Sequence, residues 1–90
     1  IIVLPISDKY LDYAKQVQSK LTDQYEFRTE LNAKDDRIGY KVREASMQKI
    51  PYVIIVGEKE LSHQTINVRS RDKGELGEMK LEDFAKSLED

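Results

Sequence analysis

The most informative absences in this 90-residue chain are those of cysteine and of any long apolar segment. Without cysteine there is no disulfide and no thiolate metal site, so nothing indicates an oxidising compartment. The longest apolar runs, residues 1–6 and 53–56, are far shorter than the roughly 20 residues of a membrane-spanning helix. No signal-peptide pattern is visible. We therefore expect a cytoplasmic domain without membrane contact.

Motifs for catalysis are also missing. The chain has no glycine-rich dinucleotide motif and no phosphate loop. The single histidine, His63, lies in a polar stretch without an evident acidic partner, which makes it a poor metal ligand or triad member. The pair Asp35 and Asp36 resembles the acidic pocket of receiver domains, but it follows the second predicted strand, and the third ends at Val56 and Gly57 without an aspartate. We expect a non-catalytic chain that holds no cofactor and no metal.

The overall composition is that of one globular domain. Hydrophobic residues make up 39% of the chain and charged residues 36%, which excludes disorder and predicts a modest core over residues 1–90. The chain opens inside an apolar run at Ile1 and not at a methionine. We therefore expect these residues to be an excised piece of a larger protein.

Hydrophobic periodicity predicts strands and helices in alternation. Residues 1–6 and 52–56 are continuously apolar, which is typical of strands buried on both faces of a parallel sheet. Residues 26–31 and 65–70 alternate, which favours half-exposed strands. Apolar residues at helical spacing predict three helices. These lie between the capping residues Ser7 or Asp8 and Gln24, between Asp35 or Asp36 and Pro51, and over residues 81–88.

The remaining segments complete the predicted topology. Residues 58–64 and 72–74 predict polar turns, and residues 76–79 predict a short strand. Strands that alternate with helices imply parallel pairing through crossovers, whereas two late strands without a helix between them imply antiparallel additions. We expect a three-layer α/β/α domain with a mixed, mostly parallel five-stranded sheet and three helices.

Charge is unevenly distributed along the chain. The net charge of −2 argues weakly against nucleic acid, whose binders usually carry a basic footprint. Residues 34–49, however, hold five basic and three acidic side chains, whereas residues 75–90 hold two basic and six acidic ones. Solvated helices often show such an asymmetry, so it is weak evidence when taken alone.

Polar side chains gather near the predicted carboxyl ends of the parallel strands, where open α/β sheets bind ligands. Residues 32–43 follow the second strand and residues 57–60 the third, and Arg69 reaches the same edge if its strand is antiparallel. Carboxylate acceptors, arginine forks and amides together suit the free edges of unpaired bases. A surface salt bridge between Glu60 and Arg69 is the alternative. The candidate residues from this chemistry are Glu60, Arg69, Arg43, Arg37, Asn67 and Asn32.

Five segments together resemble a known family. They are Gly-Tyr-Lys-Val-Arg-Glu-Ala at 39–45, Gln-Lys-Ile-Pro-Tyr at 48–52, Val-Gly-Glu-Lys-Glu at 56–60, Ile-Asn-Val-Arg-Ser-Arg at 66–71 and Leu-Gly-Glu-Met at 76–79. They resemble the C-terminal anticodon-binding domain of class IIa aminoacyl-tRNA synthetases. The fourth and fifth segments favour the threonyl members over histidyl, prolyl or glycyl relatives.

The resemblance implies binding to the anticodon loop of threonine tRNA and reading of its second and third letters, guanine and uracil. By position, Glu60 and Arg69 match the family's base-reading residues, and Arg43 and Asp35 match further contacts. Asp35 stands where the family usually has an amide. Either Asp35 contacts RNA through its backbone, or the contact moves, for example to Asn32.

The resemblance also implies a larger parent enzyme. The parent would be an ATP-dependent threonine–tRNA ligase of protein biosynthesis that binds ATP and zinc in a separate upstream catalytic domain. Family dimers form through that domain, so we expect a monomeric fragment and a homodimeric parent. The alternatives are a small α/β protein-interaction module without an RNA partner and a stand-alone regulator derived from the same domain.

Overall fold

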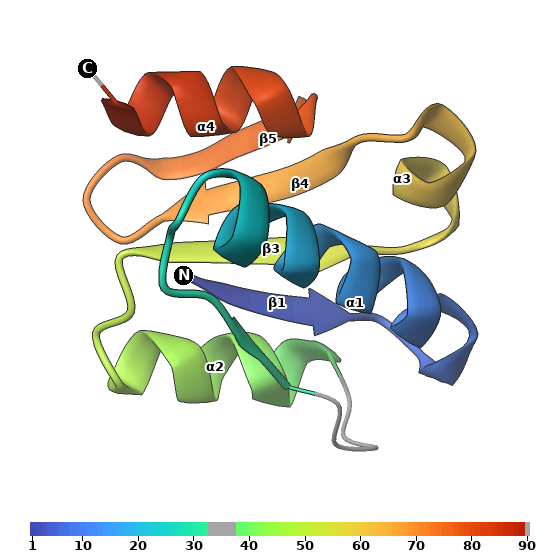
Figure 1. Ribbon diagram of the computed structural model, residues 1–90. Coiled ribbons are helices and arrows are strands. Elements are labelled where there is room, and N and C mark those ends of the chain that lie inside the picture. Colours follow the sequence, from blue (N-terminus) through green and yellow to red (C-terminus); the bar gives the residue numbers. More distant parts are fainter. Residues whose placement is uncertain (33–37, 90) are drawn as a thin grey trace.

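The computed structural model describes residues 1–32 and 38–89 of the chain. Within this part, no helix combines the length and the apolar character needed to cross a membrane. The elements in chain order are β1 (Ile2–Pro5), the 3₁₀ turn η1 (Asp8–Tyr10), α1 (Leu11–Ser19), the π-helical turn η2 (Lys20–Gln24), β2 (Glu30–Leu31), α2 (Ile38–Met47), β3 (Tyr52–Val56), α3 (Glu58–His63), β4 (Ile66–Ser70), β5 (Gly74–Met79) and α4 (Leu81–Glu89) (Figure 1).

The five strands form one mixed sheet in the order β2-β1-β3-β4-β5 (Figure 1). β1 pairs in parallel with β2 and β3, whereas β4 is antiparallel to both β3 and β5. Only β4 therefore runs against the other four strands. The predicted α/β fold with a mixed five-stranded sheet is confirmed, and the two late strands are antiparallel additions as expected.

The strand order explains which helix covers which face. The chain passes from β1 to β2 on one side and then returns across β1 to β3 on the other. Crossovers of the same hand in opposite directions leave their helices on opposite faces of the sheet. Accordingly, α1 packs on one face through Tyr13 and Val17, and α2 packs on the other through Ala45.

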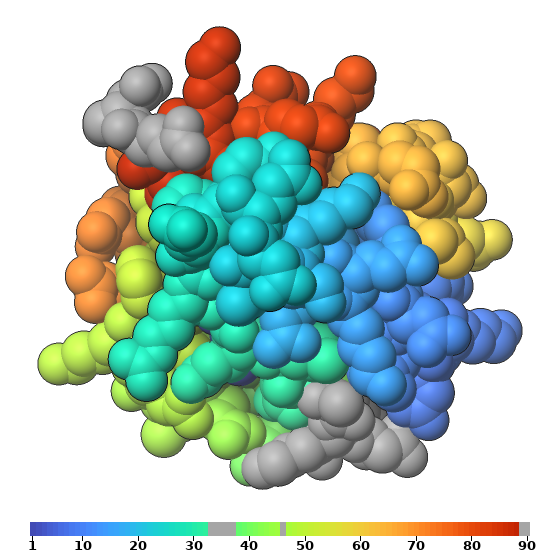
Figure 2. All heavy atoms as spheres, viewed as in Figure 1, coloured from blue at the N-terminus to red at the C-terminus, as the bar shows by residue number. Residues whose placement is uncertain are grey.

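The two faces carry cores of unequal size. On one face, α1 and α4 pack against the sheet, and the side chain of Phe84 from α4 is fully buried there. In Figure 2 the blue and cyan N-terminal segment lies over the centre of this side of the molecule, with the red C-terminal segment above it. On the other face α2 alone packs on β1 and β3. The core cluster on that second face contains no described residue of β4 or β5.

The second strand is shorter than its sequence predicts. Alternation favoured a strand over residues 26–31, but β2 contains only Glu30–Leu31. Glu26 has a left-handed φ of 59°, and the Phe27 amide donates to the Leu21 carbonyl at 2.9 Å. The chain therefore folds back against the end of the first helical segment before it joins the sheet. Ser7 precedes that segment in extended geometry and makes no side-chain capping hydrogen bond.

The segment 58–64 was predicted to be a polar turn, and this prediction is wrong. Residues Glu58–His63 form α3, a fourth α-helix, which ends at Gln64 in a left-handed conformation. The helix is too short to show an apolar period, because six residues give fewer than two turns. Its start is stabilised by a glutamate side chain, which periodicity does not report.

Candidate nucleic-acid interface

The uncovered face of β4 and β5 is hollowed beside α2. Two adjoining hollows of about 380 and 310 Å³ lie there, and Val42, Arg69 and Glu75 line both. The larger hollow extends toward the carboxyl ends of β1 and β3, and the smaller extends toward the β4–β5 turn. The remaining lining residues are Ile6, Ile38, Gly39, Ile55, Glu60 and Asn67 in the larger hollow, and Ile50, Val53, Ser70, Arg71 and Gly74 in the smaller one.

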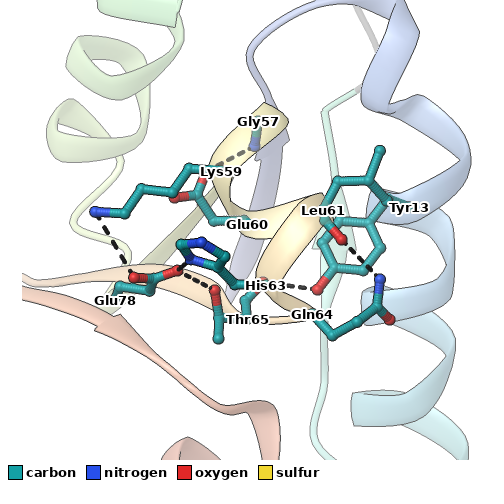
Figure 3. A network of polar contacts seen from close by, with 9 residues as sticks. All are labelled: Tyr13, Gly57, Lys59, Glu60, Leu61, His63, Gln64, Thr65 and Glu78. Atoms are coloured by element: carbon teal, nitrogen blue, oxygen red, sulfur yellow. Dashed lines mark hydrogen bonds and ion pairs between the residues drawn. The ribbon is translucent and has the colours of Figure 1, made fainter.

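Glu60 is positioned by the start of α3. Its Oε1 accepts a hydrogen bond from the Gly57 amide at 2.8 Å, and its side chain is only 8% exposed (Figure 3). A carboxylate at this position satisfies a free N–H and meets the positive end of the helix dipole. The residue therefore has a structural role in addition to the base-reading role that the resemblance implies.

Gly57 allows the tight turn between β3 and α3. A Cβ atom added at this position would lie 2.6 Å from Ile6 Cδ1 and 3.4 Å from Glu60 Oε1. The absence of a side chain therefore lets β1 and α3 approach closely at the carboxyl edge of the sheet. This packing brings Glu60 to the hollow from α3, the helix that directly follows β3.

Tyr13 supports the same corner from the covered face. Its hydroxyl donates to the Thr65 carbonyl at 2.7 Å and thus ties α1 to the segment between α3 and β4 (Figure 3). Burial raises the pKa of Tyr13, and the negative charge of Glu60 raises it further. The hydroxyl therefore stays protonated and keeps its donor role near neutral pH.

Asn67 and Arg69 project from the same side of β4. They lie opposite Ile55 and Val53 of β3, whereas Ile66 and Val68 point into the covered core. β4 is antiparallel, as the sequence argument required for Arg69. Arg69 pairs with Val53, however, which is near the beginning of β3. Its side chain therefore lies over the open face of the sheet and not at the carboxyl ends of the parallel strands. Glu60, Asn67 and Arg69 nevertheless line one hollow.

The alternative of a salt bridge between Glu60 and Arg69 is not what the structure shows. In the described part of the chain, ion pairs join Lys59 to Glu78, His63 to Glu78 and Arg71 to Asp72. Within those same residues, the Arg69 guanidinium has no hydrogen-bond or ion-pair partner. Its donors are thus available to a ligand in either hollow.

The remaining candidates do not join this group. Arg43 is exposed on α2, four residues after the lining residue Gly39, but it lines neither hollow.

Asn32 follows β2, where its backbone N–H donates to the Val3 carbonyl at 3.1 Å. Three strand spacings of about 4.8 Å separate β2 from β4, so Asn32 lies about 14 Å or more from Arg69 across the sheet. Asp35, Arg37 and the predicted cap at Asp35 or Asp36 lie outside the described residues.

The basic segment 34–49 contributes less surface charge than its composition suggests. Lys41 is 3% exposed, and its Nζ donates to the Pro5 carbonyl at 3.3 Å. The lysine therefore joins α2 to the end of β1 and does not face solvent. Helical spacing could have indicated this, because Lys41 lies on the same side of α2 as the buried Ala45.

His63 does have an acidic partner, contrary to the sequence-based expectation. Its Nδ1 lies 2.8 Å from Glu78 Oε2, which also accepts a hydrogen bond from the Thr65 hydroxyl (Figure 3). These hydrogen bonds, that of Thr65 first and that of His63 next, lower the pKa of Glu78. Lys59 adds a third contact at 3.7 Å. In the described residues, no group of three or more histidine or acidic side chains could hold a metal ion.

Comparison with known proteins shows the family of this chain. Residues 1–90 match a family model described as "Anticodon binding domain". The chain belongs to the anticodon-binding domain family. The anticodon-binding domain is 50% identical over 86 residues to the threonine–tRNA ligase of Clostridioides difficile strain 630, and 44% identical over 82 residues to that of Clostridium novyi strain NT. These matches cover 96% and 91% of the chain but only 13% of each relative.

A solved structure supports the same assignment. The anticodon-binding domain superposes with a TM-score of 0.90 on a crystal structure of the RNA-binding domain of threonyl-tRNA synthetase from Cryptosporidium parvum Iowa II, at 27% identity over 98% of this chain and 22% of that one. The resemblance to threonyl members is confirmed by these matches. A protein-interaction module without RNA is not favoured by them.

Proposed function

We propose that this domain binds the anticodon loop of threonine tRNA as a part of a threonine–tRNA ligase. The observation that carries the proposal is the convergence of Glu60, Asn67 and Arg69 on one hollow. The names of the relatives supply the tRNA and the amino acid. Unpaired anticodon bases present free Watson–Crick edges, and these are the groups that RNA-binding domains read most often.

The chemistry of the three side chains suits guanine and uracil. One oxygen of Glu60 accepts from Gly57, and the second can accept from the N1–H or the amino group of a guanine in the hollow. Arg69 can donate to base carbonyls through its planar fork, and Asn67 can both donate and accept. The family resemblance assigns the second and third anticodon letters to Glu60 and Arg69.

The proposal extends to the parent protein. The chain covers 13% of the relatives it matches. We assign amino-acid activation, with the ATP and zinc that the family resemblance implies, to a catalytic domain outside the matched segment. That domain would also supply the homodimer contact of a cytoplasmic enzyme. The domain by itself is expected to be monomeric.

A binding titration tests the proposal. The anticodon stem-loop of threonine tRNA is compared with one in which the second and third anticodon letters are changed. Tighter binding of the cognate loop is expected. Equal dissociation constants for the two loops would exclude anticodon reading by this domain.

Substitution of Glu60 tests the residue assignment. Glu60→Ala is expected to reduce discrimination at one base by about 1 kcal/mol, the lower end of the range for a bidentate contact, because only one oxygen of Glu60 is left for the base. Because Glu60 also caps α3, Glu60→Gln is the sharper variant, since its amide oxygen can still accept from Gly57. Glu58→Gln, an exposed neighbour on the same helix, is the control for net charge. Wild-type discrimination by both Glu60 variants would refute the assignment of Glu60.

A further inference from the structure

A β-bulge interrupts the pairing of β4 with β5 next to Arg69. Val68 pairs with Gly77 and Arg69 pairs with Glu75, so Leu76 is an extra residue on β5. Gly77 has a φ of +86°, which glycine adopts without steric cost. The extra residue Leu76 therefore directly precedes a glycine whose positive φ lets the strand bend at the bulge.

The bulge decides which face Glu75 occupies. Met79 packs against the covered core, and strict alternation from there would direct residues 77 and 75 to the same covered side. The extra residue shifts the alternation by one, so Glu75 faces the open side together with its partner Arg69. Consistently, Glu75 lines both hollows. Counting along the sequence would have placed this carboxylate on the wrong face.

We propose that Glu75 is a specificity-determining residue of this interface, which directs Arg69 toward base edges and away from phosphates. The inference rests on the proposed anticodon binding. Directly opposed residues of an antiparallel pair have Cβ atoms about 4.5–5.5 Å apart, within reach of two long side chains. The ion pairs of the described residues do not include Arg69 and Glu75, so the carboxylate leaves the guanidinium donors free.

The chemistry follows from the charge of the carboxylate. An arginine alone in an open hollow attracts any phosphate of an RNA backbone, and such contacts carry no sequence information. A carboxylate beside it repels phosphate and accepts hydrogen bonds from base amino and imino groups. The pair Arg69 and Glu75 therefore presents a donor fork and an acceptor side by side, which suits a base edge that contains both.

Neutralisation of Glu75 tests this inference. Glu75→Gln keeps the shape and removes the charge, and its dissociation constants are measured for the cognate and the altered anticodon stem-loops. The altered loop is expected to bind Glu75→Gln more tightly than it binds the wild-type protein. The ratio of the two dissociation constants should therefore fall at least about fivefold, the lower end of the range for one base contact. Binding should also depend more steeply on salt, because phosphate contacts increase. Glu82→Gln, exposed on α4 of the covered face, is the matched control.

Two further variants separate charge from structure. Glu75→Asp retains the carboxylate and is expected to keep more discrimination than Glu75→Gln does. Gly77→Ala strains the bulge because residue 77 has a positive φ. This change is expected to lower discrimination because it shifts the orientation of Glu75, and folding of the variant is checked by circular dichroism.

Each outcome is decisive for one of the two proposals. A Glu75→Gln variant with wild-type discrimination and salt dependence would overturn the role of Glu75 while anticodon binding stands. A uniform loss of affinity for both loops would also overturn it. Wild-type protein that binds both loops equally would overturn anticodon reading itself, and the role of Glu75 with it.

Discussion

The two faces of the sheet differ in what covers them, and β4 shows the difference within five residues. Ile66 and Val68 are fully buried beneath α1 and α4, whereas Asn67 and Arg69 on the opposite side line open hollows. The covered face stabilises the fold through apolar burial. The open face contributes little burial there and can keep polar side chains with unused hydrogen-bonding groups. Side chains that belong to the apolar core and side chains that line the hollows thus alternate along one strand.

The largest effect is expected on the covered face. Phe84→Ala removes a fully buried ring that packs edge-on against Tyr52 at a centroid distance of 5.5 Å. A loss of about 3–5 kcal/mol in the free energy of unfolding is expected, measured by urea titration. Leu76→Ala, at an exposed residue of β5, is the control and should change stability little. Similar losses in the two variants would contradict the division between the faces.

On the open face, Arg69→Ala should change binding and leave stability almost untouched. The guanidinium forms no hydrogen bond or ion pair with the other described residues. A loss of about 1–3 kcal/mol in discrimination between cognate and altered anticodon loops is expected. Arg28→Ala removes the same exposed charge away from the hollows of the open face. If Arg28→Ala weakened binding equally, net charge and not the position of Arg69 would explain the effect.

Two glycines beside the larger hollow should respond in opposite directions. Gly57→Ala places a Cβ against Ile6, whose side-chain end can shift, so a loss of about 1 kcal/mol is expected. Gly39→Ala meets no atom within 4 Å and lies in α2, so a gain of up to about 1 kcal/mol is expected from helix propensity. Both are measured by thermal or urea unfolding. A stabilising Gly57→Ala would show that the turn tolerates a side chain.

The smallest effect concerns acid stability at the corner between α3 and β5. Hydrogen bonds from Thr65 and His63 lower the pKa of Glu78 in the folded state, and Lys59 adds a further charge. The stability that Glu78 contributes is therefore present above its unfolded pKa and is lost as the pH falls through its lowered folded pKa. The difference in unfolding free energy between wild type and Glu78→Gln should narrow over that range. A constant difference across acidic pH would exclude the linkage.

Much of the fold could be predicted from local patterns. The continuous apolar runs at residues 1–6 and 52–56 and the alternation at 65–70 correspond to β1, β3 and β4, because burial on one or both faces leaves a direct trace in the sequence. Segment 26–31 alternates too, yet only its last two residues pair, since a left-handed turn at Glu26 and a contact with Leu21 compete with the sheet. Helix α3 was missed because its capping contact spans only three residues and leaves no period.

The sequence by itself determined the composition of the site and the family to which the chain belongs. Glu60, Asn67 and Arg69 could be selected as candidates because their donors and acceptors are properties of the side chains alone. Only the tertiary structure decided that these residues share a hollow, that Asn32 lies at the far edge of the sheet and that Lys41 is buried. It also decided the face of Glu75, because strand order and the bulge at Gly77 depend on pairing between distant segments, which local periodicity does not contain.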